Sequence, residues 1–299
     1  MCSPDHRIAR YADRVARDTG FPAADAGNDF SRMRRQAELS RLVHWMRRQP
    51  ADINEILPFE EVVAALGRTG ESPLGLQQVQ VRSIVGSVDR TRDFDRNFRP
   101  TSSHVRARWE RLATAQRRGE SMPPVELYRV GSMHFVIDGH HRVSIAIARH
   151  EPVIDAYVTE IRTRISPDGI NAPSDLILKD HRRLFLSRVP LADGQADAVR
   201  LTDPPHYAQL AEAVEAWGFR LTQEIGDFLS RPEVARRWFG EEFLPVVRMA
   251  RRAGIRADID SDAELYLWLA GERYRLFRRH IWDDAVFEQL SDAARRYRR

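Results

Sequence analysis

The hydrophobic pattern changes its period twice along the chain, and this constrains the fold more than any other feature. Residues 79–85 alternate apolar and polar side chains for most of their length, as a strand with one polar face does. Residues 207–228 instead carry apolar side chains three or four positions apart, as one face of a helix does. The pattern therefore predicts an α+β protein in three parts, with a helical region at 1–70, a mixed region at 76–165 and a helical region at 176–299.

The amino-terminal region contains two helical patterns. Apolar residues within the segment 33–46 recur at roughly helical spacing, and residues 59–66 form a second, shorter pattern that Gly67 ends. The composition of residues 67–73, which include glycine, serine and proline, is typical of a linker. We therefore expect a boundary between the first two regions at this segment.

The mixed region alternates short strand and helix patterns. Strands are predicted at 125–130, 134–137 and 153–161, and a helix is predicted to begin just after Gly139. Another helix is predicted after Pro100. Its candidate capping residues are Thr101, Ser102 and Ser103. The residues that share one face of this helix are Val105, Trp109, Leu112 and Gln116.

One short stretch of this region carries the residues best suited to chemistry. An apolar strand ends at Asp138, Gly139 permits a tight turn, and a helix of small residues follows at once. The N–H groups and the positive dipole end at such a helix start attract anions. Arg142 in the first turn adds a two-pronged donor, and His140 and His141 add donors whose charge depends on pH. The stretch therefore predicts a phosphate site.

The order of strand, Asp-Gly-His-His-Arg turn and helix, with further strands on both sides, resembles the core of the ParB/sulfiredoxin superfamily. The resemblance covers about residues 76–162, less than a third of the chain. In that superfamily a Gly-x-x-Arg turn holds nucleotide phosphates, as Gly-Glu-Arg-Arg in ParB proteins and Gly-Cys-His-Arg in sulfiredoxins, and residues 139–142 match both at their ends. The resemblance implies that Gly139 and Arg142 contact phosphate, with the helix start at 101–103 as a second contact region.

Two departures from the family patterns reduce the number of functions that the resemblance can imply. His140 stands where sulfiredoxins have their nucleophilic cysteine, so repair of peroxiredoxins is excluded. After the last predicted strand the chain reads Arg-Thr-Arg-Ile-Ser, without the Glu-Asn-x-x-Arg stretch that ParB clamps use for nucleotide turnover, and we find no convincing helix-turn-helix pattern. These departures argue against a plasmid-type partition protein.

The combined prediction is a ParB-like nucleotide- or phosphate-binding protein with a regulatory or phosphotransfer role. The candidate catalytic bases are Asp138 and His140. The candidate phosphate contacts are Gly139, His141, Arg142, Ser144, Thr101, Ser102 and Ser103. A nucleoside triphosphate, CTP or ATP, would bring Mg²⁺ with it. Adjacent histidines point about 100° apart on a helix, which argues against a metal site shared by the two. Whether the chain is an NTP-dependent hydrolase or kinase stays open.

Two other functions also stay open. One is a DNA-associated ParB-like nuclease, or a transcription or partition regulator, and the other is an interaction scaffold whose core has lost its ligand. The net charge of +4 is concentrated in residues 71–165, which carry 15 Arg against 11 acidic residues. Because this excess is modest and both flanks are nearly neutral, we expect DNA binding to be weak and non-specific.

Structural roles compete with functional ones at several of these residues. Asp138 can simply cap the helix, and Arg142 can form an ion pair with Asp138. The Arg- and Asp-rich residues 86–96 can be a solvated loop, and the arginines of residues 295–299 can be a solvated tail or a contact for nucleic acid.

Composition excludes several classes of protein. Of the 47 basic residues, 46 are Arg and one is Lys179, and no glycine precedes a lysine, so a P-loop is excluded. The single cysteine, Cys2, excludes internal disulfides and cysteine-rich zinc sites. No apolar run approaches the roughly 18 residues of a membrane span, and the amino terminus has no secretion signal, so we expect a cytoplasmic protein.

Overall fold

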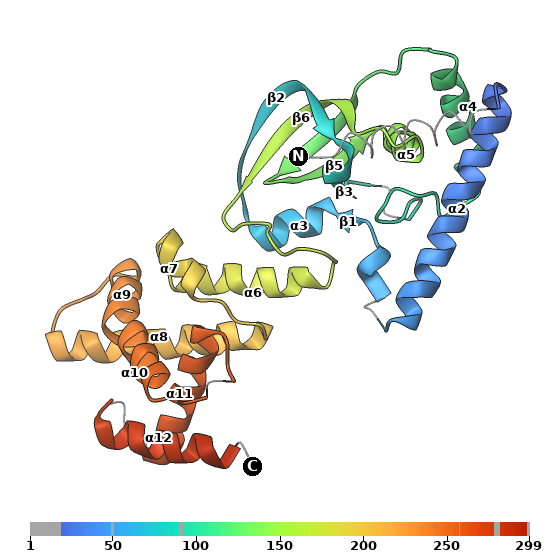
Figure 1. The fold of residues 1–299 in the computed structure, drawn as a ribbon. Helices are drawn as coiled ribbons and strands as arrows, with labels where there is room; N and C mark the ends of the chain where they lie inside the picture. Colours follow the sequence, from blue (N-terminus) through green and yellow to red (C-terminus); the bar gives the residue numbers. More distant parts are fainter. Residues whose placement is uncertain (1–18, 49–50, 90–91, 257, 278–281, 298–299) are drawn as a thin grey trace. The chain divides into compact units, whose positions relative to one another are not determined.

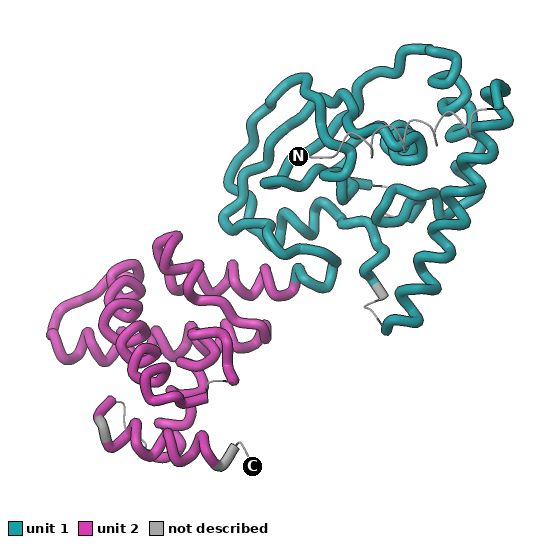
Figure 2. Tube along the Cα trace, viewed as in Figure 1, with its two compact units in different colours: residues 1–176 teal, residues 177–299 magenta. Residues whose placement is uncertain are grey.

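The computed structural model divides the chain into two compact units, unit 1 at residues 1–176 and unit 2 at residues 177–299 (Figure 2). The residues that the structure describes are 19–48, 51–89, 92–256, 258–277 and 282–297. Each unit has a hydrophobic core of its own. None of the helices in these ranges combines the length and the apolar character that a membrane crossing requires.

A six-stranded mixed sheet is the centre of unit 1 (Figure 1). In spatial order its strands are β1 (Leu57–Pro58), β3 (Ile84–Ser87), β5 (Met133–Asp138), β4 (Val125–Val130), β6 (Val153–Thr163) and β2 (Arg68–Gln80). Strand β3 is parallel to β1 and β5, and β4 is parallel to β6. The pairs β4–β5 and β2–β6 are antiparallel. This sheet and its helices confirm the predicted α+β class.

Three helices of unit 1 pack against one another, namely α2 (Pro22–Met46), α4 (Arg106–Arg117) and α5 (His140–Ala148). The buried residues that they share with the neighbouring loop are Ala26, Phe30, Met33, Phe94, Val105, Trp109, Ala113, Ile145 and Ala148. Helix α2 therefore lies in the same compact unit as the sheet, not in a helical region of its own. The shorter helices of unit 1 are η1 (Ala51–Asn54), α3 (Phe59–Leu66) and η2 (Val81–Ser83).

Two predictions for the segment around strand β2 are wrong, one of a linker and one of a single strand. The expected linker at 67–73 is the start of β2, which pairs with β6 from Arg68 onward through two irregularities in register. Gly67 adopts a positive φ of 74° and turns the end of α3 directly into this strand. The single strand expected at 79–85 is two strands, because the turn η2 separates β2 from β3 and hides in the alternating pattern.

The cap predicted for helix α4 is also wrong. The helix begins at Arg106, its capping position is Val105, and no side chain caps it. The predicted helix face is confirmed at Val105 and Trp109, which are buried. The polar residues at 101–103 therefore lie outside the helix, in the segment that leads into it.

Unit 2 consists of helices in its described residues. These are most of α6 (Asp175–Arg188), then α7 (Asp193–Ala198), α8 (Pro204–Ile225), α9 (Arg231–Arg237), the π-helical segment η3 (Trp238–Phe243), α10 (Leu244–Arg252), α11 (Asp262–Phe277) and α12 (Asp284–Tyr297). The helical spacing predicted from residue 207 is confirmed in α8, where Tyr207, Leu210 and Val214 are buried. Phe228 lies beyond the end of α8 and is exposed.

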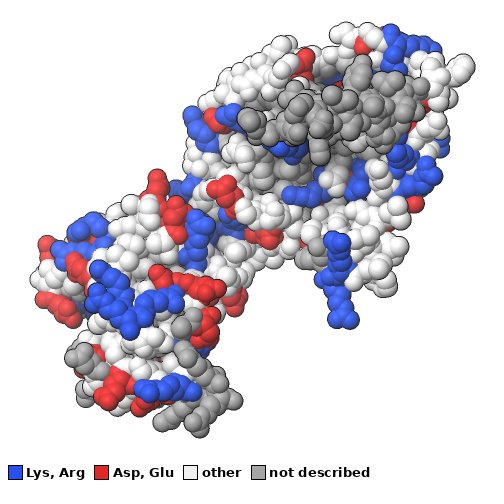
Figure 3. Space-filling model, in the orientation of Figure 1, with Lys and Arg blue, Asp and Glu red and all other residues white. Residues whose placement is uncertain are grey.

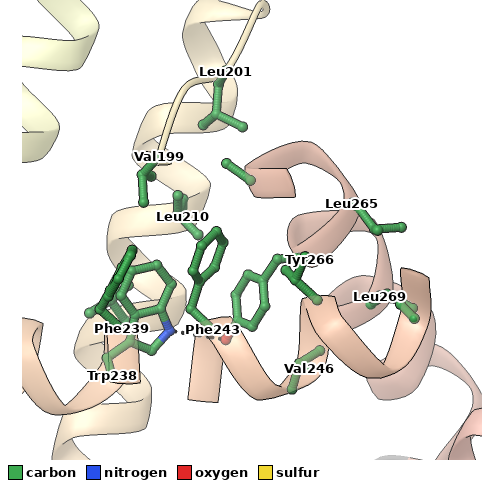
Figure 4. Packing of buried hydrophobic residues seen from close by; sticks show 14 of the residues in the cluster. Val199, Leu201, Leu210, Trp238, Phe239, Phe243, Val246, Leu265, Tyr266 and Leu269 are labelled. Carbon is green, nitrogen blue, oxygen red and sulfur yellow. Dashed lines mark hydrogen bonds between the residues drawn. The ribbon is translucent and has the colours of Figure 1, made fainter. Parts of the chain in front are cut away.

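Aromatic side chains fill the centre of unit 2 (Figure 4). Trp238 and Phe243 come from the π-helical segment and pack on Tyr266 of α11, with ring centroids 5.5 Å apart in both pairs. The indole N–H of Trp238 donates a hydrogen bond to the Tyr266 hydroxyl at 3.1 Å. Helix α11 follows Ser261, whose hydroxyl accepts from the Glu264 N–H at 3.3 Å and so caps the helix.

Candidate functional site

The turn between β5 and α5 has a backbone geometry that requires glycine. Gly139 adopts φ 103° and ψ 20°, in the left-handed region. A Cβ atom at this position would lie 2.5 Å from Val125 Cγ1 and 3.1 Å from Arg142 Cζ. Gly139 brings no side chain that could cap α5, and the positive dipole end of the helix favours an anion at this position.

Arg142 ties the turn to the segment that precedes β4. Its Nη1 donates to the carbonyl oxygens of Pro123 and Pro124 at 2.6 and 2.8 Å. Its Nη2 donates to Asp138 Oδ2 at 2.5 Å. These acceptors engage three of the five N–H donors of the guanidinium. The structural ion pair considered from the sequence is therefore formed, and the exposed Asp138 carboxylate is held beside the turn.

His140 is buried at the end of the parallel strands β3 and β5. Its Nε2 lies 2.6 Å from the hydroxyl of Ser87, the last residue of β3, which is fully buried. The ring stacks on Phe94 with centroids 6.3 Å apart and is tilted against Phe98 at 6.5 Å. Ser87 and the two phenylalanines were not predicted as part of the site, although Ser87 directly follows an apolar strand pattern.

His141 is also buried and contacts the same phenylalanine in a different geometry. Its ring meets the Phe94 ring edge to face, with centroids 5.6 Å apart. Among the residues that the structure describes, no group of three or more His, Cys, Asp or Glu side chains is arranged to hold a metal ion. Phe94 therefore packs against both histidine rings on the buried side of the turn.

The loop at 92–100 is packed against the protein. This corrects the expectation of a solvated loop at residues 86–96 for Phe94 and Asp95, which are buried. Asp95 is buried and accepts from the N–H groups of Asn97 and Arg99, both at 2.9 Å, and from Arg99 Nε at 2.8 Å. Burial raises the pKa of the Asp95 carboxyl, and these donors oppose the rise. Arg92 is exposed as expected, while Arg90 lies outside the described residues.

The second predicted contact region forms local bonds of its own. The Thr101 hydroxyl donates to the Arg92 carbonyl oxygen at 2.7 Å. The Ser102 hydroxyl is bonded to His104 Nδ1, and the exposed Ser103 accepts the Arg106 N–H at its carbonyl oxygen. The Thr101 N–H also donates to the Asp93 carbonyl oxygen at 3.0 Å, so this segment is bonded to the packed loop.

Ser144 lies in the core, away from the surface of the turn. Its hydroxyl is fully buried and accepts a hydrogen bond from Trp109 Nε1 at 2.9 Å. The structure thus brings Asp138, Gly139 and Arg142 together, pairs His140 with Ser87, and bonds Ser144 to Trp109 in the core.

No family model and no curated protein matches the chain. The chemistry of the turn must therefore carry the functional argument.

The turn combines three properties that suit a phosphorylated ligand. It offers the positive end of helix α5, a fixed guanidinium, and an exposed carboxylate at Asp138 that can meet a cation. His140 and His141 are buried beneath the turn, whereas Asp138 is exposed, so a ligand would approach from the side of Asp138.

Proposed function

We propose that the protein binds a nucleotide, or another phosphorylated small molecule, at the β5–α5 turn and acts as a regulatory or phosphotransfer protein. The observation that carries this proposal is the left-handed glycine at the start of α5, which supplies no capping side chain of its own to this helix end. A Cβ at Gly139 would overlap Val125, so the backbone approaches its neighbours closely here. The phosphate would accept from the first-turn amides.

Asp138 and Arg142 have complementary roles in this proposal. Arg142 holds the turn through the Pro123 and Pro124 carbonyl oxygens, and its remaining N–H donors would bond to the phosphate. The exposed Asp138 carboxylate would repel a bare phosphate, so we expect Mg²⁺ to accompany the ligand. Magnesium prefers one or two carboxylates together with phosphate oxygens and water, which a single aspartate at this edge can satisfy.

Binding is better supported than catalysis. His140 is buried, bonded to Ser87 and enclosed by two phenylalanine rings, so few of its atoms can reach a ligand. A general base must come within hydrogen-bond distance of the proton that it removes. Asp138 is the better placed of the two predicted bases, because its carboxylate is 65% exposed.

Calorimetric titration of the full chain with CTP, ATP, GTP and inorganic phosphate, with and without Mg²⁺, tests the proposal. Arg142→Ala removes charge-assisted hydrogen bonds, so we expect roughly tenfold to hundredfold weaker binding of whichever ligand binds. Asp138→Asn should reduce the Mg²⁺-dependent part of the affinity and change the Mg²⁺-free part little. Arg82→Ala, an exposed arginine of the same unit, is the matched control and should bind as the wild type does.

Two outcomes would overturn the proposal. One is that no member of the panel binds to the wild-type chain. The other is that Arg142→Ala and Arg82→Ala bind a ligand with the same affinity while both remain folded by circular dichroism.

A further inference from the structure

The two halves of helix α2 present apolar residues on opposite faces. In the first half, the core of unit 1 includes Ala26, Phe30, Met33 and Ala37, which follow one another at helical spacing and are buried. Beyond Ala37 the same face becomes polar, with Ser40 and His44 half-buried toward unit 1. The Ser40 hydroxyl is bonded to Asn54 Oδ1 of η1 at 3.4 Å.

The second half of α2 turns its large apolar residues to solvent. We call this set the apolar stripe, and its members are Leu39, Leu42, Val43, Trp45 and Met46. Four of them occupy positions i, i+3, i+4 and i+7, which share one helix face. Their exposed fractions, with that of Trp45, lie between 41% and 76%. An amphipathic helix normally buries its apolar face, so this inversion indicates that the stripe meets a partner.

Arginines surround the apolar stripe. Residues 32–48 contain six arginines and a single acidic residue, Glu38. At the beginning of the stripe, a shallow pocket of about 350 Å³ is lined by Phe30, Ser31, Arg34, Arg35, Glu38 and Arg106. In Figure 3 blue side chains outnumber red ones along the edge of unit 1 where Figure 1 places α2. The partner is therefore anionic as well as apolar.

The charge of the segment around the apolar stripe favours one kind of partner over another. A second copy of the chain would bring two segments of net charge +5 against each other, which opposes self-association through this face. An anionic bilayer presents phosphates on every side of an inserted apolar face, which matches arginines both before and after the stripe. A basic helix with leucines and a tryptophan on its apolar face is the pattern of helices that lie in the lipid interface.

We propose that the second half of α2 docks on the surface of a membrane rich in anionic phospholipid. The apolar stripe inserts at the boundary between headgroups and acyl chains. The pocket lined by Arg34, Arg35 and Arg106 receives a lipid phosphate, which competes with the Glu38 partner of Arg34 and the Glu110 partner of Arg106. This interaction is independent of the ligand proposed for the β5–α5 turn.

Vesicle flotation with the full chain tests this proposal. We use vesicles of phosphatidylcholine alone and vesicles mixed with phosphatidylglycerol. The protein is expected to float with the mixed vesicles only, and less so as salt is raised. The double variant Leu42→Glu, Met46→Glu should bind at least about tenfold more weakly. Because both side chains are exposed, this variant keeps the fold.

A control and a second variant separate the possible occupants. Phe228→Glu changes an apolar residue of unit 2 that is even more exposed, and this variant should float as the wild type does. Arg34→Glu with Arg35→Glu should abolish flotation and leave thermal unfolding unchanged. Failure of the wild type to float, or equal flotation of the Leu42 and Phe228 variants, would overturn the proposal. So would a dimer in sedimentation that Leu42→Glu dissociates, or duplex DNA binding that depends on Arg34 and Arg35 but not on Leu42.

Discussion

Each unit buries a polar cluster, but the cluster of unit 2 is closed and that of unit 1 opens to solvent. In unit 2, Glu242 Oε1 accepts from Trp282 Nε1 at 2.8 Å and from the Tyr266 hydroxyl at 3.3 Å. Arg273 Nη1 lies 3.6 Å from the same oxygen. In unit 1, the buried His140 follows directly on a turn whose Asp138 carboxylate is exposed.

The difference separates a stabilising cluster from a candidate site. Burial, and then the charge of Glu242, raises the pKa of Tyr266, so its hydroxyl stays protonated and can donate to the carboxylate. The Arg273 guanidinium also lies 4.1 Å from the centre of the Trp282 ring. Glu242 thus has its partners inside the protein. At the β5–α5 turn, Gly139 and the first residues of α5 are buried, but the neighbouring Asp138 carboxylate is exposed to solvent, where a ligand or its cation can bind.

The largest effect should come from opening the closed cluster. Glu242→Ala leaves Arg273 buried without its carboxylate, so we expect the free energy of unfolding of unit 2 to fall by about 3–5 kcal/mol. Chemical denaturation followed by tryptophan fluorescence measures this loss. Glu241→Ala removes a neighbouring exposed carboxylate and should change stability by no more than about 0.5 kcal/mol. Equal losses in the two variants would remove the distinction between the clusters.

The next effect concerns the open cluster. Gly139→Ala combines a strained positive φ with the overlap on Val125, so we expect unit 1 to lose roughly 2–4 kcal/mol and phosphate binding to disappear. Gly119→Ala is the matched control, because Gly119 has φ 82° but nothing within 4 Å of an added Cβ. It should lose about 1 kcal/mol from backbone strain alone. A loss as small in Gly139→Ala would contradict the geometry of the turn.

A smaller effect is expected at Ser144, which the sequence assigned to the phosphate site. Ser144→Ala leaves the Trp109 indole N–H without its acceptor and should destabilise unit 1 by about 1–3 kcal/mol. Ligand affinity at the turn should not change. If calorimetry instead finds weaker binding at unchanged stability, Ser144 belongs to the site and not to the core.

The smallest effect that we predict is a change in the pH dependence of stability, and it concerns His134 of unit 1. His134 Nδ1 lies 2.9 Å from the Ser83 hydroxyl, at the start of β5, and burial together with Arg129 lowers its pKa from 6.5 to about 4. The folded state favours the neutral ring, so this contribution is present above pH 6.5 and lost as the pH falls toward 4. His134→Gln should therefore lose less stability than the wild type between about pH 7 and pH 5. Parallel losses would contradict the lowered pKa.

The sequence predicts the turn well because its signals are local. An apolar strand, an Asp-Gly pair and a helix of small residues follow one another without interruption, so Asp138, Gly139 and Arg142 are found together. Ser87 was missed because its partner His140 is 53 positions away. Only the parallel pairing of β3 with β5 brings these two residues to the same edge of the sheet.

Strand β2 and helix α2 show a different limit. Much of β2 is exposed, and its glycine, serine and proline residues resemble a linker until β6 pairs with them. In α2 the apolar spacing is visible in the sequence, but the face that unit 1 covers is not. Periodicity identifies a stripe, whereas tertiary packing decides whether that stripe is buried.

Hydrogen exchange of the full chain, with and without a saturating nucleotide and Mg²⁺, tests the central claim most directly. The amides of residues 140–143 would bind or adjoin the phosphate, so we predict that the ligand slows their exchange. The peptides that contain Glu242 and Tyr266 should exchange at the same rate in both samples. Protection confined to unit 2 or to α2, with no change at residues 140–143, would contradict the assignment of the site to the β5–α5 turn.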